Sequence, residues 1–336
     1  MLTVSVPGKV HLIGEHAVVY GEPAILASVG KRIFIHAEKG DGIRIEDGKD
    51  ILEWSIEGVK DFGKKASQLW EECKEKGNFS DVVKFTYGKN FAKAALGFLF
   101  NKFGVQEGLN LRIETDLPRG AGLGYSAAYA VGLVKTVSEV FDLELGREKI
   151  NELAYEIEKF AHGTPSGGDN STCCFGGLIW FEKGNPPRIE PLKKEIPYPL
   201  ENFVLAYIKP PEKSTGELVQ MIGDLDPEFR EPRIKAIGKA TWEMRKALRE
   251  SDFQRVKELI NLAWKNLSDL GLSIPEADEV IEKIVSLGGA AKLCGACGGG
   301  ILLAYHEDKE RLKEVIKETG YEPWEVKLGV EGVRRE

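Results

Sequence analysis

The chain has 336 residues and a mass of 37.2 kDa, which is enough for about two domains. Hydrophobic residues make up 42% and charged residues 29%, so the chain can bury a sizeable core and is not a disordered tail. Its 46 basic and 53 acidic residues give a net charge of −7, which disfavours a general nucleic-acid-binding protein, because such proteins need a basic surface.

Targeting signals are the next feature that the sequence addresses. No run of about 18 apolar residues is present, so we expect no membrane-spanning helix. The first residues lack a basic stretch followed by a long apolar one, so we expect no secretory signal. Five cysteines, an odd number, do not suggest a secreted disulfide framework. Together these features predict a cytoplasmic protein.

The first part of the chain is predicted to be rich in strands. Alternating or continuous apolar runs favour strands, and longer apolar periodicity favours helices. The sequence predicts strands over residues 2–6, 10–13, 24–29, 32–38, 43–45, 51–56, 109–115 and 178–182, with Pro7-Gly8 ending the first of them. It predicts helices over residues 61–77, 90–103, 126–141 and 147–161.

The second part is predicted to be rich in helices. Five prolines between residues 184 and 199 favour a connection between two lobes, since proline disrupts helix and sheet interiors. After it we expect strands over 203–208, 301–305 and 324–328, and helices over 214–223, 230–250, 253–269, 276–287 and 309–319. No repeat of 20–50 residues is present. The sequence therefore predicts an α+β fold in two domains, residues 1–185 and 186–336.

A glycine-rich turn between a predicted strand and a predicted helix is the strongest chemical signal. Gly120, Gly122 and Gly124 lie within the segment Pro118–Ala128. Glycine permits positive φ and lets backbone N–H groups converge on an anion, and a helix starting near Ser126 adds its free N–H groups. Phosphate binding is the predicted chemistry, and a tight turn without a ligand is the alternative. The spacing fits neither the Walker loop nor the dinucleotide fingerprint.

Two carboxylates form a second candidate group. Glu158 lies near the end of a predicted helix, and Asp169 lies in the loop that follows it. One carboxylate could hold Mg²⁺, which takes one or two protein oxygens beside substrate phosphates, while the other orients or deprotonates a hydroxyl. The alternative is that Glu158 is a solvated helix residue and that Asp169 caps the next helical turn.

A third group lies close to the N-terminus. Lys9, His11, Glu15 and His16 crowd a predicted strand–turn–strand unit. A lysine can neutralise phosphate charge, and it can lower the pKa of a neighbouring carboxylate. The alternative is an exposed lysine and hydrogen-bonded structural histidines. The two histidines do not share a helix face, so they are not a zinc pair.

Another glycine-rich loop spans residues 292–300 and carries Cys294 and Cys297. This C-x-x-C spacing is compatible with a zinc site or a redox pair. Small cysteine side chains in a crowded loop are the alternative.

The segments Gly14–Gly21, Pro118–Ala128, His162–Asn170 and Lys292–Gly300 occur in an order and at separations that together resemble the GHMP kinases, the family of galactokinase, homoserine kinase, mevalonate kinase and phosphomevalonate kinase. The resemblance implies a ribosomal-S5-like N-terminal domain that binds ATP, a ferredoxin-like C-terminal domain, and an active site in the cleft between them. Gly14–Gly21 and His162–Asn170 are most similar to the mevalonate-phosphorylating members.

The reaction implied is therefore ATP-dependent phosphorylation of the C5 hydroxyl of (R)-mevalonate, an early step of isoprenoid synthesis. The alternative within the family is a kinase for another small alcohol, either phosphomevalonate or a sugar. A non-catalytic relative would be expected to lack Lys9, Glu158 or Asp169, and all three are present. We expect no nucleic-acid or membrane partner. The sequence is compatible with a homodimer and does not decide the oligomeric state.

The resemblance also implies site residues. It makes Asp169 and Lys9 catalytic, and it makes Ser126 and Glu158 ligands of Mg²⁺. The residues implied to wrap the ATP phosphates are Pro118, Gly120, Ala121, Gly122, Leu123, Gly124, Tyr125 and Ser126, and those implied to contact the substrate are Glu15, His16, Tyr129, Thr215 and Gly295. The chain departs from the family at Tyr125, where a serine is usual, and at Cys294 and Cys297, where Ser or Thr and Gly are usual.

Overall fold

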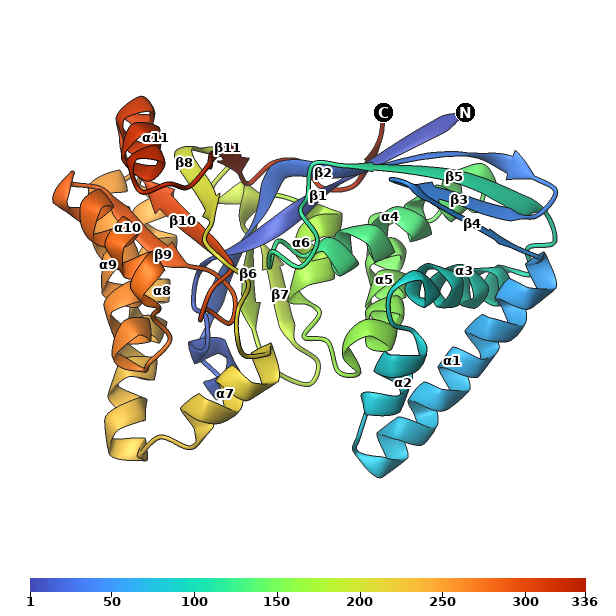
Figure 1. Ribbon diagram of the computed structural model, residues 1–336, viewed down its shortest axis with the longest axis horizontal. Helices are drawn as coiled ribbons and strands as arrows, with labels where there is room; N and C mark the ends of the chain where they lie inside the picture. The colour runs from blue at the N-terminus through green and yellow to red at the C-terminus, as the bar shows by residue number, and fades with distance from the viewer.

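A computed structural model describes all 336 residues (Figure 1). The strands are β1 (Leu2–Ile13), β2 (Ala24–Gly40), β3 (Ile43–Asp47), β4 (Asp50–Trp54), β5 (Gly108–Thr115), β6 (Leu178–Glu182), β7 (Arg188–Pro191), β8 (Leu200–Tyr207), β9 (Ala290–Leu293), β10 (Ile301–Tyr305), β11 (Pro323–Leu328) and β12 (Arg334–Arg335). The helices are α1 (Ile56–Lys76), α2 (Ser80–Phe85), α3 (Lys89–Phe103), α4 (Tyr125–Val140), α5 (Arg147–His162), α6 (Gly168–Phe175), α7 (Thr215–Gly223), α8 (Pro227–Arg249), α9 (Phe253–Asp269), α10 (Pro275–Ser286) and α11 (Lys309–Glu318). Two short 3₁₀ helices span Ala17–Tyr20 and Leu192–Lys194.

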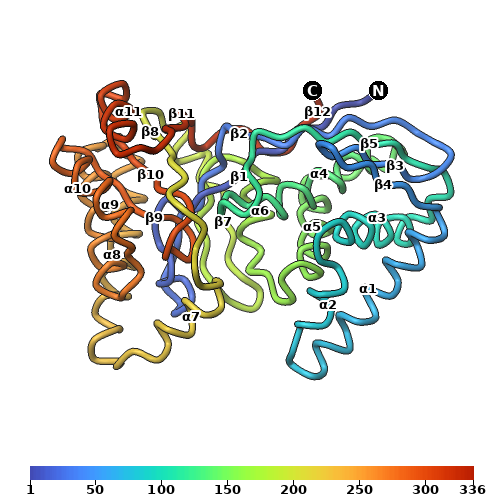
Figure 2. Tube along the Cα trace, in the orientation of Figure 1, coloured from blue at the N-terminus to red at the C-terminus, as the bar shows by residue number.

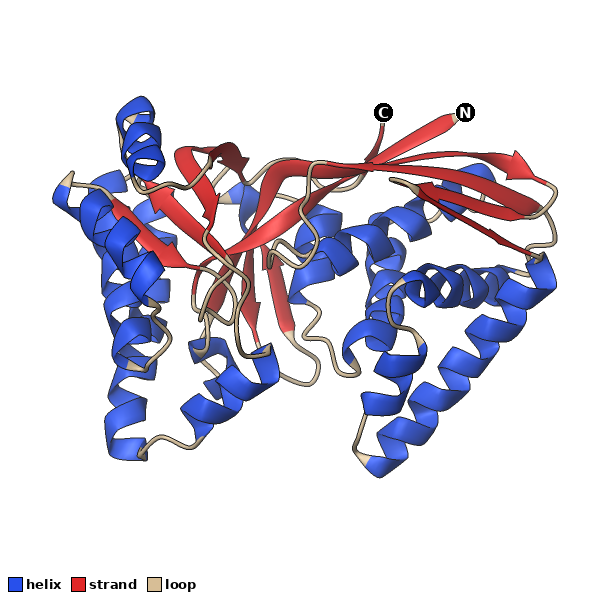
Figure 3. Cartoon of the chain, viewed as in Figure 1, coloured by secondary structure: helices blue, strands red, loops and turns tan.

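One sheet of 12 strands runs through both halves of the molecule. Its main path is β4-β3-β5-β2-β11-β8-β10-β9. Off this path, β1 pairs with β2 and β12, and β6 pairs with β2 and β7. Figures 1 and 3 show β1, β2 and β5 along the upper side of the view and β6 and β7 running down through its middle, with α1 to α3 at one end and α8 to α10 at the other. The last strand pairs with the first, so the two termini lie close together (Figure 2). No helix combines the length and apolar character needed to cross a lipid bilayer.

The sequence predicted the strands 178–182 and 301–305 and the helix 253–269 with the bounds that the structure has. It was wrong to end a strand at Pro7-Gly8, because β1 continues to Ile13 with a register shift between Pro7 and Gly8. Such a bulge lets a strand pass a residue that has no N–H to donate. The two strands predicted over 24–29 and 32–38 are likewise one strand, β2.

Short elements went unpredicted. These are α2, α6, β7, β9 and β12. Asp169, predicted in a loop, lies in the first turn of α6. The proline-rich segment also contains β7, which pairs with β6, so it continues the sheet and is not a free connection. The boundary at 185/186 falls inside this hairpin, and the division into residues 1–185 and 186–336 stays a prediction.

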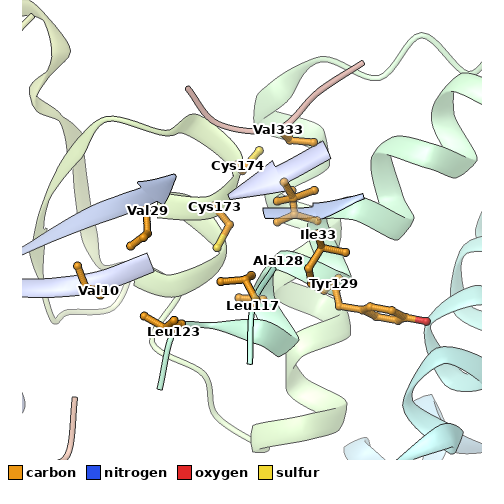
Figure 4. Close-up of a cluster of buried hydrophobic side chains, with 14 of the residues drawn as sticks. Val10, Val29, Ile33, Leu117, Leu123, Ala128, Tyr129, Cys173, Cys174 and Val333 are labelled. Atoms are coloured by element: carbon orange, nitrogen blue, oxygen red, sulfur yellow. The ribbon is translucent and has the colours of Figure 1, made fainter. Parts of the chain in front are cut away.

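Two hydrophobic clusters make up most of the core. The larger one has 64 buried residues and extends from β1 and β2 into α8, α9 and β10. The smaller one has 24 residues and lies between the second-half strands and α7 to α11. Figure 4 shows Leu117, Leu123 and Ala128 in the larger cluster with Val10 of β1 and Val29 of β2. The residues around the first glycine-rich turn are therefore anchored in the core.

Candidate functional site

The glycine loop, residues 118–126, leads from β5 into α4. Gly120, Gly122 and Gly124 have φ values of 72°, 82° and 70°, a region that side chains other than glycine rarely adopt. Leu117 and Leu123 are 2% and 1% exposed, so the loop is anchored in the core, while Gly120 and Gly122 are exposed. The first N–H groups of α4 have no partner within the helix and carry its positive dipole end. This arrangement fits the predicted binding of an anion.

The glycine loop lies against β1 at very close range. The Lys9 amide donates to the Leu123 carbonyl over 2.9 Å. A Cβ atom on Gly8 would lie 2.8 Å from that carbonyl oxygen, and one on Gly124 would lie 2.7 Å from the Cγ atom of Lys9. Only glycine at both positions allows this contact, which places the Lys9 side chain beside the start of α4.

Lys9 and Asp169 form an ion pair, with 3.0 Å between Nζ and Oδ2. The Lys9 side chain is 6% exposed, and that of Asp169 is 37% exposed. Asp169 lies at the N-terminal end of α6, so the charge of its carboxylate is also favoured by the helix dipole. The pair leaves the carboxylate open to a ligand while the ammonium group stays behind it.

Glu158, Ser126 and His162 form a second polar group. Ser126 Oγ lies 3.3 Å from Glu158 Oε2 and 3.0 Å from His162 Nε2. Glu158 is 2% exposed, and burial, followed by the nearby Asp169 carboxylate, raises the pKa of Glu158 to about 8. Its Oε1 atom is buried and has no hydrogen-bond partner.

The Ser126 and Glu158 oxygens fit Mg²⁺. No group of three or more His, Cys, Asp or Glu side chains surrounds a common point in this chain, so the protein alone forms no complete metal cage. Mg²⁺ usually keeps water and phosphate ligands and takes only one or two oxygens from the protein. The Glu158 carboxylate, whose Oε1 atom has no partner and whose Oε2 atom contacts the Ser126 hydroxyl, forms with Ser126 a donor set of this kind.

These groups surround one cavity of about 670 Å³. The first half of the chain contributes Lys9, Glu15, His16, Gly120, Gly122, Gly124, Tyr125, Ser126, Glu158, His162 and Asp169 to its wall, and the second half contributes Thr215, Val219, Gly295 and Ala296. The cavity thus brings together the predicted catalytic, metal-binding and phosphate-binding segments and four of the five predicted substrate residues.

The fifth predicted substrate residue, Tyr129, does not reach the cavity. It is 5% exposed, is absent from the cavity wall and belongs to the larger hydrophobic cluster. Its ring stacks on that of Tyr125, with 6.0 Å between centroids. Figure 4 shows the Tyr129 ring pointing away from Leu123. Among the loop residues, Pro118, Ala121 and Leu123 also lie outside the cavity wall.

The sequence missed two residues of this region. The sequence pattern predicts no role for His162, yet its Nε2 atom contacts Ser126. It predicts none for Lys292 at the start of the 292–300 loop, yet the Lys292 ammonium group pairs with Glu15. The pairing joins residues 277 positions apart, so no local spacing could reveal it. Cys294 and Cys297 are free, buried thiols.

Comparisons with known proteins assign the chain to one family. The family model of the GHMP kinases N terminal domain matches residues 90–177, and the family model of the GHMP kinases C terminal domain matches residues 244–322. A mevalonate kinase of Pyrococcus abyssi is 30% identical, covering 100% of this chain and 98% of that protein. One of Thermococcus gammatolerans is 32% identical, covering 99% and 97%.

Solved structures are similar over the same length. The crystal structure of the Methanococcus jannaschii mevalonate kinase has a TM-score of 0.82 and 25% sequence identity, covering 97% of this chain and 98% of that one. The match extends across both halves of the sheet. It confirms the predicted two-domain fold of mixed helices and strands.

Proposed function

The chain belongs to the GHMP kinase family, and from this we propose that it is an ATP-dependent kinase that phosphorylates the C5 hydroxyl of (R)-mevalonate. The product would be 5-phosphomevalonate, an intermediate of isoprenoid synthesis. The observation that carries the proposal is that the Lys9–Asp169 pair and the N-terminus of α4 face one cavity in a chain whose full-length relatives are mevalonate kinases.

The nucleotide's phosphates bind at the glycine loop in this proposal. Backbone N–H groups at Gly120, Gly122 and the start of α4 stabilise the phosphate oxygens. Ser126 and the ionised form of Glu158 would hold Mg²⁺, which neutralises phosphate charge when bound. Phosphoryl transfer depends mainly on such positioning and charge stabilisation, with little covalent chemistry for the protein to perform.

Asp169 acts on the acceptor alcohol. Its partly exposed carboxylate orients the primary hydroxyl and accepts its proton as the new P–O bond forms and the bond between the γ-phosphorus and ADP breaks. An alcohol becomes acidic only when that bond is largely made, so the proton moves late. Lys9, 3.0 Å from the carboxylate, fixes Asp169 and adds positive charge next to the phosphates.

The acceptor lies between the two halves of the chain. Glu15 and His16 bind it from the first half, and Thr215 and Gly295 bind it from the second. Residues 1–185 and 186–336 are the two domains in this proposal, with the cavity between them. Tyr129 contributes through its stacking on Tyr125 and not by direct contact.

The test is an ADP-coupled assay with mevalonate, phosphomevalonate and a set of sugars as acceptors. We expect turnover with mevalonate. Phosphorus NMR should identify the product as the C5 phosphate. Turnover with phosphomevalonate or a sugar but not with mevalonate would overturn the substrate and leave a GHMP-type kinase for another small alcohol. No turnover with any acceptor would contradict the kinase proposal itself.

A further inference from the structure

A fully buried ion pair joins the two halves of the chain beside the cavity. The Lys292 ammonium group, on β9, pairs with the carboxylate of Glu15, and both side chains are 0% exposed. In every other ion pair of the molecule at least one side chain is partly exposed. Lys292 belongs to neither the catalytic pair nor the proposed metal site, so it needs an explanation of its own.

The surroundings of Lys292 leave its ammonium group no freedom. Besides Glu15 Oε1, Nζ donates to the carbonyl oxygen of His11 at 3.2 Å and to that of Leu293 at 3.3 Å. Nζ also lies 3.7 Å from Cys294 Sγ, so the three hydrogens of the ammonium group are surrounded by four acceptors and none lacks a partner. The position of the Glu15 oxygen that they hold is therefore fixed by the backbone of both β1 and β9.

The second carboxylate oxygen of Glu15 is not satisfied by the protein. Glu15 Oε2 is buried and has no hydrogen-bond partner, and Glu15 lines the cavity. A buried carboxylate oxygen without a partner is costly unless a ligand supplies the missing donor. The neighbouring His16 is tied to the same part of the second half, since its Nε2 atom lies 2.9 Å from the Ala296 carbonyl oxygen.

Stability alone does not explain why the chain keeps a buried ion pair at this place. Replacing a buried ion pair by apolar side chains of similar size is often neutral or stabilising, whereas removing one partner is strongly destabilising. A charged pair whose carboxylate has one unpartnered oxygen, on a residue that lines a cavity, is better explained by a role toward a ligand.

We propose that Lys292 is a positioning residue for the phosphoryl acceptor. It holds Glu15 by one carboxylate oxygen so that the second oxygen accepts a hydrogen bond from a hydroxyl group of the acceptor. The second half of the chain thereby sets the geometry of a binding group that belongs to the first half. This inference rests on the proposed function, because it takes a small alcohol as the acceptor.

The experiment compares steady-state kinetics of Lys292→Met and Lys292→Gln with those of the unchanged protein. We expect the KM for mevalonate to rise about tenfold or more, as befits a misplaced hydrogen bond to a charged group, while the KM for ATP stays within about twofold. Lys292→Gln keeps one donor for Glu15 and is expected to be the milder variant. A loss of folded protein lowers the apparent kcat but leaves both KM values unchanged, so the KM values separate positioning from stability.

Arg32→Met is the matched control. Arg32 is a buried cation that donates to the Ser5 and Gly332 carbonyl oxygens and lies outside the cavity wall. Its loss is expected to destabilise the fold without moving either KM.

An unchanged KM for mevalonate in both Lys292 variants would overturn the positioning role and leave the proposed function intact. An equal rise of both KM values, or a similar rise in Arg32→Met, would overturn it too. If the unchanged protein does not phosphorylate mevalonate, the proposed function fails and this inference fails with it.

Discussion

Two lysine–carboxylate pairs face the same cavity and differ mainly in burial. In the Lys9–Asp169 pair the carboxylate side chain is 37% exposed, whereas in the Lys292–Glu15 pair both side chains are 0% exposed. A carboxylate that must meet a hydroxyl and take its proton has to be reachable. A carboxylate that only accepts a hydrogen bond, as we propose for Glu15, takes no proton and can be held rigidly by a buried partner. The comparison therefore separates a group for chemistry from a group for position.

The largest expected effect is the loss of turnover when Asp169 of the Lys9–Asp169 pair is replaced. Asp169→Asn keeps the size of the side chain but removes the base, so we expect kcat to fall by about 10²–10⁴-fold. Binding of ATP, measured by calorimetry, should persist because Asp169 lies on α6 and not in the glycine loop. Asp50→Asn is the matched control, since Asp50 also lies 3.0 Å from a lysine, Lys89, but far outside the cavity wall. Turnover of Asp169→Asn near that of the unchanged protein would refute its catalytic role.

The second effect is on stability, where we expect the buried Lys292–Glu15 pair to contribute more than the Lys9–Asp169 pair. Lys292→Met leaves an unpaired charge in the interior, and we expect the free energy of unfolding to fall by about 3–5 kcal/mol. Lys9→Met leaves Asp169 in contact with water, and we expect a loss of about 1 kcal/mol. Urea denaturation of the two variants measures both values. Equal losses would show that burial does not distinguish the pairs.

The sequence revealed one of these pairs and not the other, for a physical reason. Lys9 and Asp169 each lie in a motif whose composition already suggests chemistry, and family resemblance connects the motifs. Lys292 and Glu15 also lie in motifs, but their contact depends on how β9 packs beside β1, which sequence spacing does not encode.

The same distinction applies to the fold. Helix 253–269 was predicted because its apolar periodicity is long, while α6, with eight residues that begin at a glycine pair, gave too short a pattern. Tyr129 was assigned to the substrate by resemblance, although its position in the core depends on packing against Tyr125 and Phe91.

The third effect concerns the carboxyl group next to the exposed pair. Burial raises the pKa of Glu158 to about 8 from an ordinary value of 4.5, so folding favours its protonated form. The stability that this proton confers is complete below pH 4.5 and is lost as the pH rises through about 8. Glu158→Gln cannot titrate, so without metal it should match the unchanged protein near pH 4 and be the more stable of the two at pH 8 and above.

Denaturation of both proteins across this range, in a chelator, measures the difference at each pH. Comparing the two proteins cancels the titration of groups that lie away from Glu158. A difference that does not change with pH would show that Glu158 is not held in its neutral form.

The smallest effect is expected at Tyr125, the residue that departs from the family pattern in the glycine loop. Its ring stacks on Tyr129 and lies 5.0 Å from the Arg119 guanidinium carbon, and its phenolic oxygen is buried without a hydrogen-bond partner. Burial raises the pKa of Tyr125 to about 12, so the group is a neutral donor at physiological pH. A single neutral hydrogen bond contributes about 1 kcal/mol, so Tyr125→Phe should raise the KM for ATP by no more than about tenfold.

Tyr125→Ser separates the hydroxyl group from the ring. If the phenol donates to the nucleotide, Tyr125→Phe and Tyr125→Ser should both raise the KM for ATP and leave that for mevalonate unchanged. If the ring only narrows the cavity, Tyr125→Phe should behave as the unchanged protein and only the serine variant should differ. A change in the KM for mevalonate would place Tyr125 with Lys292 among the residues that position the acceptor, and would remove the division of the cavity between a nucleotide side and an acceptor side.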